Sequence, residues 1–297
     1  MKYLAPIVLF TYNRLNLLKL CINSLKKNEL SKYSKLYIYS DGPKNSNDKI
    51  RIKKVRKYLK NINGFKKKVI VLRKNNFGLT RNIVDGVTNT IKKEKNIIVL
   101  EDDLIVSKYF LKFMNEALNK YKKQKEIWHI SGWNYNLEID IHEDSYFTRG
   151  MNCWGWATWH DRWKHFEKKP KKIVSTWNKK KIKGFNFDNS INFYSQILRN
   201  YNNKLDSWAI FWYASIYSNK KLCLNPTKSL TQNIGVSSRA TNTKSVEKTF
   251  NSKLTKKNYK NFIFPTELRE NQQIYNYIKK QSNLNKVKNA LRKIMNF

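Results

Sequence analysis

The residues of the sequence that are best suited to bind a cation form one acidic cluster, Glu101-Asp102-Asp103. With 21 acidic residues in 297, about 0.1 such triplets would be expected by chance. The cluster follows residues 97–100, an apolar run typical of a buried strand. Carboxylate oxygens are hard ligands that suit Mg²⁺ or Mn²⁺, so we expect a divalent cation to bind here. A solvated loop is the alternative.

Further polar residues follow the other apolar runs in the first 82 residues. Ligands of open α/β sheets bind at the carboxyl ends of the strands, so we expect these residues to line the same site. No GxxxxGK[ST] or GxGxxG segment occurs, which excludes a P-loop and a Rossmann dinucleotide grip. A simple turn is the alternative for Asp41-Gly42-Pro43. The residues singled out are Thr11, Asn13, Arg14, Asp41 and Arg81.

The elements that must position these residues alternate between strands and helices. β-rich runs predict strands at 7–10, 36–40, 69–72, 97–100 and 127–131. Apolar residues spaced by three and four predict helices at 15–27, 48–62, 79–93 and 108–122. This βαβ succession predicts an α/β fold with a mostly parallel central sheet flanked by helices on both faces.

The composition changes from about residue 146, where aromatic residues become frequent. Farther along, a second aromatic stretch at 206–218 predicts another helix. No linker rich in Pro, Gly or Ser separates the two parts. We therefore expect residues 1–131 and 132–260 to be subdivisions of one domain, followed by a tail at 261–297.

The charge is strongly positive, with 60 basic and 21 acidic residues and a net charge of +39. Such a field favours nucleic acid, anionic lipid or acidic substrates. Only 11 of the basic residues are arginine, and they are scattered, whereas sequence-specific nucleic-acid readers depend on arginine. We expect no specific nucleic-acid partner.

The cysteines and the hydropathy pattern bear on the compartment. The three cysteines are widely spaced and form no CxxC or Cys/His pattern, which argues against a disulfide framework or a zinc site. No apolar run approaches the 18 residues of a membrane span. We expect a cytoplasmic protein.

Seven segments, in order along the chain, carry a resemblance to a known family. The first four resemble the nucleotide-binding half of GT-A glycosyltransferases, and the fourth is similar to that family's DxD-type metal motif in an EDD form. The other three are similar to segments of bacterial sugar transferases and, more distantly, of the N-acetylglucosaminyltransferase that starts hybrid N-glycans. The segments are APIVLFTYNR, YSDGPK, FGLTRNI, IIVLEDDLIVS, NCWGWATW, LDSWAIFW and SLTQNIGVSS.

The resemblance implies a metal-dependent glycosyltransferase. Its donor would be a nucleotide-sugar, expected to be a UDP-sugar, with Mn²⁺ or Mg²⁺ as cofactor. Its acceptor would be a hydroxyl of a glycan or glycolipid in the synthesis of bacterial surface polysaccharide, such as capsule, or of lipopolysaccharide.

The resemblance also implies roles for residues of the donor site. Asp103 would contact the metal, Asp102 would lie near the metal or the ribose, and Glu101 would support them. Asp41 would accept the N–H of a uracil base. Related enzymes often carry a His after the NIG segment; here Ser237 and Ser238 would cover the diphosphate instead. Thr11, Asn13, Arg14 and Arg81 would contact the nucleotide and its diphosphate.

On the acceptor side, the resemblance makes Asp206 the general base that deprotonates the acceptor hydroxyl, with inversion. Its aromatic neighbours are expected to desolvate its charged form and raise its proton affinity; a helix N-cap is the alternative role. Aromatic faces suit the C–H surfaces of sugars, so we expect an acceptor platform of Trp154, Gly155, Trp156 and Trp208, the alternative being that the tryptophans are core. A retaining outcome, or a polyanion-binding protein without activity, are the competing interpretations.

The tail has apolar residues at helical spacing with basic residues between them, and no acidic residue after Glu270. Such a helix suits an anionic membrane surface. The alternative is that the apolar stripe packs on the catalytic domain or on a second subunit. The apolar positions are Ile274, Tyr277, Ile278, Leu284, Val287, Leu291, Ile294 and Met295.

Overall fold

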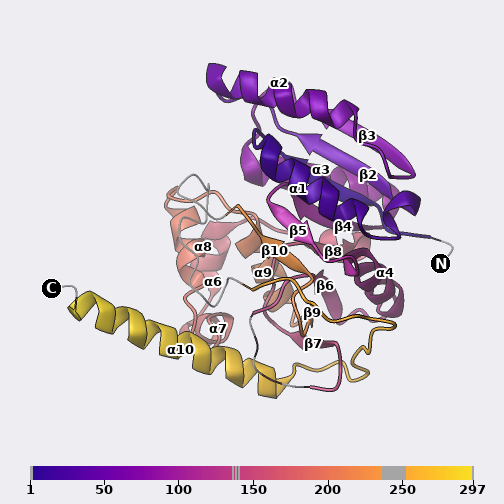
Figure 1. Cartoon of the computed structure of the whole chain (residues 1–297). Helices are drawn as coiled ribbons and strands as arrows, with labels where there is room; N and C mark the ends of the chain where they lie inside the picture. The colour runs from indigo at the N-terminus through magenta and orange to yellow at the C-terminus, as the bar shows by residue number, and fades with distance from the viewer. Residues whose placement is uncertain (1–2, 136, 138, 140, 236–251, 296–297) are drawn as a thin grey trace.

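The computed structural model describes residues 3–135, 137, 139, 141–235 and 252–295, and the side chains of α10 up to residue 284. Its first part follows the predicted alternation of strands and helices (Figure 1). The elements are β1 Ile7–Thr11, α1 Leu15–Lys26, η1 Ser31–Tyr33, β2 Lys35–Ser40, α2 Ser46–Lys60, β3 Lys67–Leu72, α3 Gly78–Glu94, β4 Asn96–Glu101, β5 Leu104–Val106, α4 Phe110–Lys120 and β6 Ile127–Ser131.

The later part of the chain adds short strands and helices to the same sheet. The sheet has eight strands in the order β3-β2-β1-β4-β8-β6-β9-β7, and β10 and β5 form a separate antiparallel pair. The elements are β7 Ser145–Thr148, β8 Trp156–Trp159, α5 His160–Trp163, α6 Pro170–Thr176, α7 Lys179–Phe185, α8 Tyr194–Tyr201, α9 Ala209–Ser218, β9 Leu222–Pro226, β10 Thr231–Asn233 and α10 Gln272–Met295.

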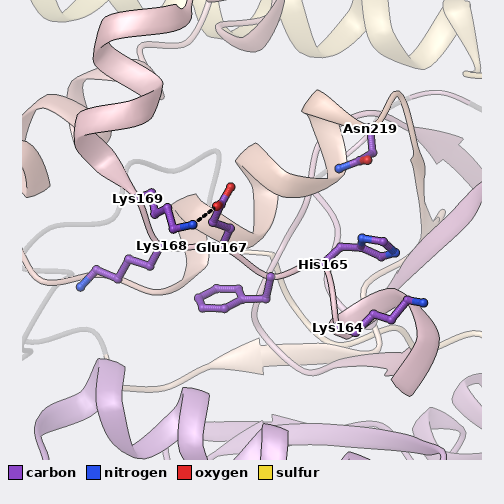
Figure 2. Close-up of a pocket in the computed structure, with 7 residues that line it drawn as sticks. Lys164, His165, Glu167, Lys168, Lys169 and Asn219 are labelled. Carbon is purple, nitrogen blue, oxygen red and sulfur yellow. Dashed lines mark ion pairs between the residues drawn. The ribbon is translucent and has the colours of Figure 1, made fainter.

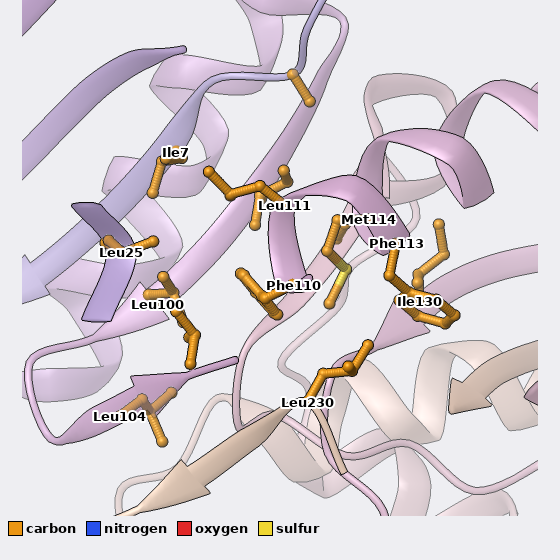
Figure 3. Packing of buried hydrophobic residues seen from close by; sticks show 14 of the residues in the cluster. Ile7, Leu25, Leu100, Leu104, Phe110, Leu111, Phe113, Met114, Ile130 and Leu230 are labelled. Atoms are coloured by element: carbon orange, nitrogen blue, oxygen red, sulfur yellow. The ribbon is translucent and has the colours of Figure 1, made fainter. Parts of the chain in front are cut away.

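The sheet is buried on both faces, as expected for parallel strands between helices. In β1, Ile7 and Leu9 belong to the core cluster that packs against α1, α2 and α4 (Figure 3). Val8 and Phe10 belong to the opposite cluster, which packs against α3 and α9. The predicted α/β class with a mostly parallel, helix-covered sheet is confirmed.

One part of the sheet departs from a purely parallel arrangement. β8 lies between β4 and β6 and is antiparallel to both, and β7 is antiparallel to β9. All four residues of β8 are buried. The second half of the aromatic segment that suggested a ligand platform is therefore a central strand, whereas Trp154 and Gly155 precede it.

The tail helix α10 begins by docking onto the domain. Ile274, Tyr275 and Ile278 are buried in a third hydrophobic cluster, and Lys279 Nζ lies 2.6 Å from a carboxylate oxygen of Asp188. Figure 1 shows α10 running past α7 to the C-terminus. For these first turns the structure favours packing on the domain over membrane contact.

Farther along α10, Leu284 is exposed. The remaining stripe positions, 287, 291, 294 and 295, have side chains outside the described part. Among the helices that the structure describes, none is both long and apolar enough to cross a bilayer.

Candidate active site

The parallel strands bring the predicted residues to one edge of the sheet. In the register of β1 with its neighbours, Thr11 is opposite Ser40, and Phe10 is opposite Glu101. The segments that follow β1, β2 and β4 therefore emerge side by side at the carboxyl ends of the strands.

Asp102 is buried at 2% exposure and holds the segment after β1. Its Oδ2 accepts hydrogen bonds from Thr11 Oγ1 at 2.8 Å and from the backbone N–H of Tyr12 at 3.2 Å. Its Oδ1 accepts a hydrogen bond from Arg14 Nη2 at 2.6 Å. Charge-assisted bonds of this kind are strong, so Thr11 and Arg14 fix Asp102 before any ligand binds.

Arg14 also binds Asp103, with Nη2 at 3.0 Å from Oδ2. Burial opposes the charged form of Arg14, but the two aspartates outweigh it and raise its pKa. Burial, with the charge of Asp102, raises the pKa of Asp103 despite Arg14. Burial and the charges of Asp103 and Asp102 also raise the pKa of Glu101 to about 8.

Whether this acidic cluster fits a divalent cation depends on which other ligands are present. No group of three or more His, Cys, Asp or Glu side chains among the described residues is arranged to hold a metal by itself. Mg²⁺ is, however, commonly bound through one or two carboxylates together with substrate phosphates. Two carboxyl groups share one guanidinium, and Asp103 is the aspartate with more exposure, at 15% against 3% for the Asp102 side chain. The donor set therefore fits a cation that binds together with a diphosphate.

The segment before residue 236 packs directly on Asp103, a contact that the sequence analysis missed. β10 pairs with β5, and the Ile234 N–H donates to the Asp103 carbonyl oxygen at 2.8 Å. A Cβ on residue 235 would lie only 2.6 Å from Asp103 Cβ, so Gly235 is what permits this approach. Ser237 and Ser238 lie outside the described residues.

Asp41 is engaged differently from the expectation. It is 5% exposed, and its oxygens accept hydrogen bonds from the backbone N–H groups of Gly42 and Phe77, both at 2.8 Å, and of Gly78 at 3.0 Å. The Asn76 side-chain amide donates a fourth, at 3.2 Å. Four donors fill a carboxylate, so in this structure Asp41 holds the loop before α3 and has no free lone pair for a uracil N–H.

Asn13 belongs to a second hydrogen-bonded group that the sequence did not reveal. Asp48, in the first turn of α2, accepts hydrogen bonds from Asn13 Nδ2 at 2.6 Å and from the Tyr12 hydroxyl at 2.7 Å. The Tyr12 hydroxyl in turn accepts a hydrogen bond from the Lys44 N–H at 3.2 Å. Asp48 thus ties the segment after β1 to the segment after β2.

Arg81 is exposed and stacks on an aromatic ring. Its guanidinium carbon lies 4.1 Å from the centroid of the Phe77 ring, and that of Arg73 lies 4.5 Å from the same centroid. Arg73 also pairs with Asp85. Arg81 therefore presents a positive charge close to the loop that Asp41 holds.

The predicted aromatic platform is corrected for two of its members. Trp156 and Trp208 are buried and stack on each other with ring centroids 5.2 Å apart, and His129 stacks on Trp156 at 5.4 Å. These two tryptophans are core residues, because other rings cover their faces. Trp154 is half-buried and meets Trp133 edge to face at 5.0 Å.

Gly155, between the two tryptophans, is needed for close packing rather than for sugar contact. Its φ is +74°, and a Cβ there would lie 2.7 Å from Thr231 Cγ2. Thr231 Oγ1 also donates to the Trp154 carbonyl oxygen at 2.7 Å. The glycine lets β10, and with it the segment on Asp103, lie against the sheet.

Asp206 does not have the desolvated position that its aromatic neighbours suggested. It lies before α9, which begins at Ala209, and its side chain is 65% exposed. The N-cap residue of α9 is Trp208, which makes no side-chain capping bond. Asp206 forms an ion pair with Lys168. The expected burial was wrong, because the rings point into the core while the carboxylate remains in solvent.

Lys168 also lines an open hollow of about 570 Å³ between residues 164–169 and the end of α9. Figure 2 shows that Glu167 and Lys169 pair with each other at its wall, with His165 and Asn219 opposite. The lining is mixed in charge, and none of the residues predicted for the donor site is part of it. Its lining residues are Lys164, His165, Phe166, Glu167, Lys168, Lys169 and Asn219.

Comparison with known proteins gives one family match. The family model described as Glycosyl transferase family 2 matches residues 7–163. No curated protein sequence matches the chain. The crystal structure of TarS residues 1–349 from S. aureus is similar with a TM-score of 0.44 and 11% identity, over 78% of this chain and 61% of that chain. This chain thus covers less than two thirds of that TarS chain. The mannosyltransferase PcManGT from Pyrobaculum calidifontis, in complex with GDP-Man and Mn²⁺, is similar with a TM-score of 0.39 and 6% identity, over 73% of this chain and 70% of that chain.

Proposed function

We propose that this chain, which belongs to glycosyl transferase family 2, is a nucleotide-sugar-dependent glycosyltransferase that transfers a sugar from a UDP-sugar to a hydroxyl of a glycan or glycolipid acceptor. The observation that carries the proposal is the acidic pair after β4. Asp102 is buried and fixed by Thr11 and Arg14, while Asp103 next to it is more exposed. This arrangement supports a preformed donor site at the carboxyl edge of the sheet.

Asp103, with Asp102 beside it, would hold Mn²⁺ or Mg²⁺. When bound, the metal would neutralise the charge that develops on the nucleoside diphosphate leaving group. Arg14 and Arg81 would supply further positive charge for the diphosphate, and Ser237 and Ser238 would cover it, as the sequence resemblance implies. The choice of UDP comes from the sequence resemblance, since Asp41 is occupied by the loop before α3.

For the acceptor, Asp206 would be the general base of a single displacement with inversion. Its exposed carboxylate is accessible to an acceptor hydroxyl, and the ion pair with Lys168 has to open for a proton to transfer. Acceptor binding would exclude water and strengthen Asp206 as a base. A retaining outcome is the competing mechanism, and the stereochemistry of the product in a single turnover separates the two.

The acceptor class and the location are proposed together. Surface polysaccharide and lipopolysaccharide are built on lipid-linked acceptors, and the basic C-terminal end of α10 would bring the enzyme to the cytoplasmic face of an anionic membrane. The part of α10 that would do so follows the docked turns at Ile274 and Ile278.

A turnover screen tests the function. Release of nucleoside diphosphate from UDP-, GDP- and CMP-sugars is measured with Mn²⁺, with and without EDTA. We expect turnover of a UDP-sugar that EDTA abolishes. Turnover that persists in EDTA would contradict the metal requirement, and preference for a GDP- or CMP-sugar would contradict uracil as the base of the donor nucleotide. No turnover with any donor would favour the polyanion-binding alternative.

A further inference from the structure

Arg14 occupies an unusual position between the two aspartates of the donor site. A single nitrogen, Nη2, lies 2.6 Å from Asp102 Oδ1 and 3.0 Å from Asp103 Oδ2. The Asp102 side chain is nearly inaccessible, whereas the Arg14 side chain is 34% exposed. One guanidinium therefore pairs with both carboxylates from the solvent side of the site and offsets only one of their two negative charges.

The backbone of Arg14 is fixed independently of this ion pair. Its carbonyl oxygen accepts a hydrogen bond from the Leu18 N–H at 3.1 Å, which starts α1. The preceding residue, Asn13, is held by Asp48. The guanidinium can therefore leave the aspartates by side-chain rotation alone, without movement of the strand or helix.

The two aspartates differ in how much they depend on Arg14. Asp102 keeps the Thr11 hydroxyl and the Tyr12 N–H as partners when Arg14 leaves. For Asp103, Arg14 is the one side-chain donor that the described residues supply. Asp103 is thus the carboxylate that can exchange Arg14 for another cation.

A guanidinium and a divalent cation on the same carboxylate repel each other strongly in a partly buried site. A nucleoside diphosphate removes that conflict. Some of its oxygens can accept hydrogen bonds from the guanidinium, while others serve as ligands of the metal. Binding of the metal and binding of the nucleotide would then each favour the same movement of the Arg14 guanidinium, from Asp103 to the diphosphate.

We propose that Arg14 is an internal competitor for the divalent cation, bound to Asp103 in the empty site and transferred to the diphosphate when metal and nucleotide enter together. The inference rests on the proposed function, since it assumes the metal at Asp103. It predicts weak metal binding without nucleotide, and positive coupling between Mn²⁺ and UDP that depends on Arg14.

The test measures the Kd for Mn²⁺ by electron paramagnetic resonance of free Mn²⁺, with and without UDP. The variants are Arg14→Met, which removes the guanidinium, and Arg14→Lys, which keeps the charge without the planar fork. Arg51→Met is the matched control, because Arg51 is an exposed arginine on α2 for which no ion pair with Asp102 or Asp103 is found in the described structure. Circular dichroism verifies the fold of each variant.

Without UDP, Arg14→Met should bind Mn²⁺ about tenfold or more tightly than wild type, within the usual range of coupling between sites. Arg14→Lys should lie between the two, and Arg51→Met should match wild type. UDP should tighten Mn²⁺ binding to wild type much more than to Arg14→Met.

An unchanged or weaker Mn²⁺ affinity in both Arg14 variants would overturn the inference while leaving the metal site intact. A wild-type protein that binds no Mn²⁺ even with UDP would instead contradict the proposed metal site itself, and the inference with it. Equal tightening in Arg51→Met would show a general charge effect and would also overturn it.

Discussion

The proposed donor edge and the proposed acceptor side use the same chemical group in opposite ways. At the donor edge, Asp41 and Asp102 are buried and accept several hydrogen bonds from backbone and side-chain donors. On the acceptor side, Asp206 is mostly exposed and is paired with Lys168. The first two carboxylates hold loops in place, whereas Asp206 contributes little to the fold.

This difference bears on how each side prepares for catalysis. A site whose groups are fixed before binding loses little free energy to ordering when the ligand arrives. The donor edge is organised in that way by its own hydrogen bonds. In the proposed mechanism, by contrast, the Asp206 side would become shielded from water only when the acceptor binds, so base catalysis would depend on a bound acceptor.

The largest expected effect on stability comes from Asp41→Asn. The amide replaces one acceptor oxygen by a donor and leaves at least one buried N–H of Phe77 or Gly78 without a partner. We expect the free energy of unfolding to fall by about 2–4 kcal/mol, measured by urea denaturation.

Asp206→Asn is the matched comparison, and its free energy of unfolding should stay within about 0.5 kcal/mol of wild type, because the residue is exposed and its ion pair is screened. A loss of more than 2 kcal/mol in Asp206→Asn, or none in Asp41→Asn, would break the contrast between the two sides.

A smaller effect concerns the end of α10. A chain that ends at residue 284 keeps the docked turns with Ile274 and Ile278, but lacks Lys286, Lys288, Arg292 and Lys293. Each cation near an anionic surface contributes on the order of 1 kcal/mol, so binding to anionic vesicles should fall by about tenfold or more. Co-sedimentation at low salt measures this, with neutral vesicles as the control.

Stability of the shortened chain should be unchanged, since the buried contacts that the structure describes for α10, at Ile274, Tyr275 and Ile278, remain. Equal sedimentation of the full and shortened chains with anionic vesicles would show that the tail end is not a membrane anchor.

Much of the first half of the fold could be predicted, because local pattern and tertiary role agree there. Each βα unit shows its own periodicity, and both-face burial in β1 gives the continuous apolar run of residues 7–10. β8 could not be recognised, since Trp156–Trp159 is identified as a strand only by its pairing with β4 and β6. The short strands β5 and β10 likewise are identified only by their antiparallel pairing with each other.

The site shows the same limit. Residue type and position after a strand located Asp102, Asp103 and Arg14 at one edge, as the register confirms. The contacts of Asp48 and Gly235 depend on segments distant in the sequence, and no local signal marked them. The aromatic neighbours of Asp206 wrongly suggested a buried carboxylate. Their rings face the core, whereas the Asp206 side chain, on the same segment, faces the solvent.

In the proposed mechanism, Asp103 serves donor binding and Asp206 serves the chemical step. The most direct measurement is calorimetric titration of UDP, with Mn²⁺ present, into wild type, Asp103→Asn and Asp206→Asn, each also assayed for turnover. We expect Asp206→Asn to bind UDP like wild type while its kcat falls by about 10²–10⁴, and Asp103→Asn to lose Mn²⁺-dependent UDP binding together with turnover. Loss of UDP binding in Asp206→Asn, or full Mn²⁺-dependent binding in Asp103→Asn, would contradict the account.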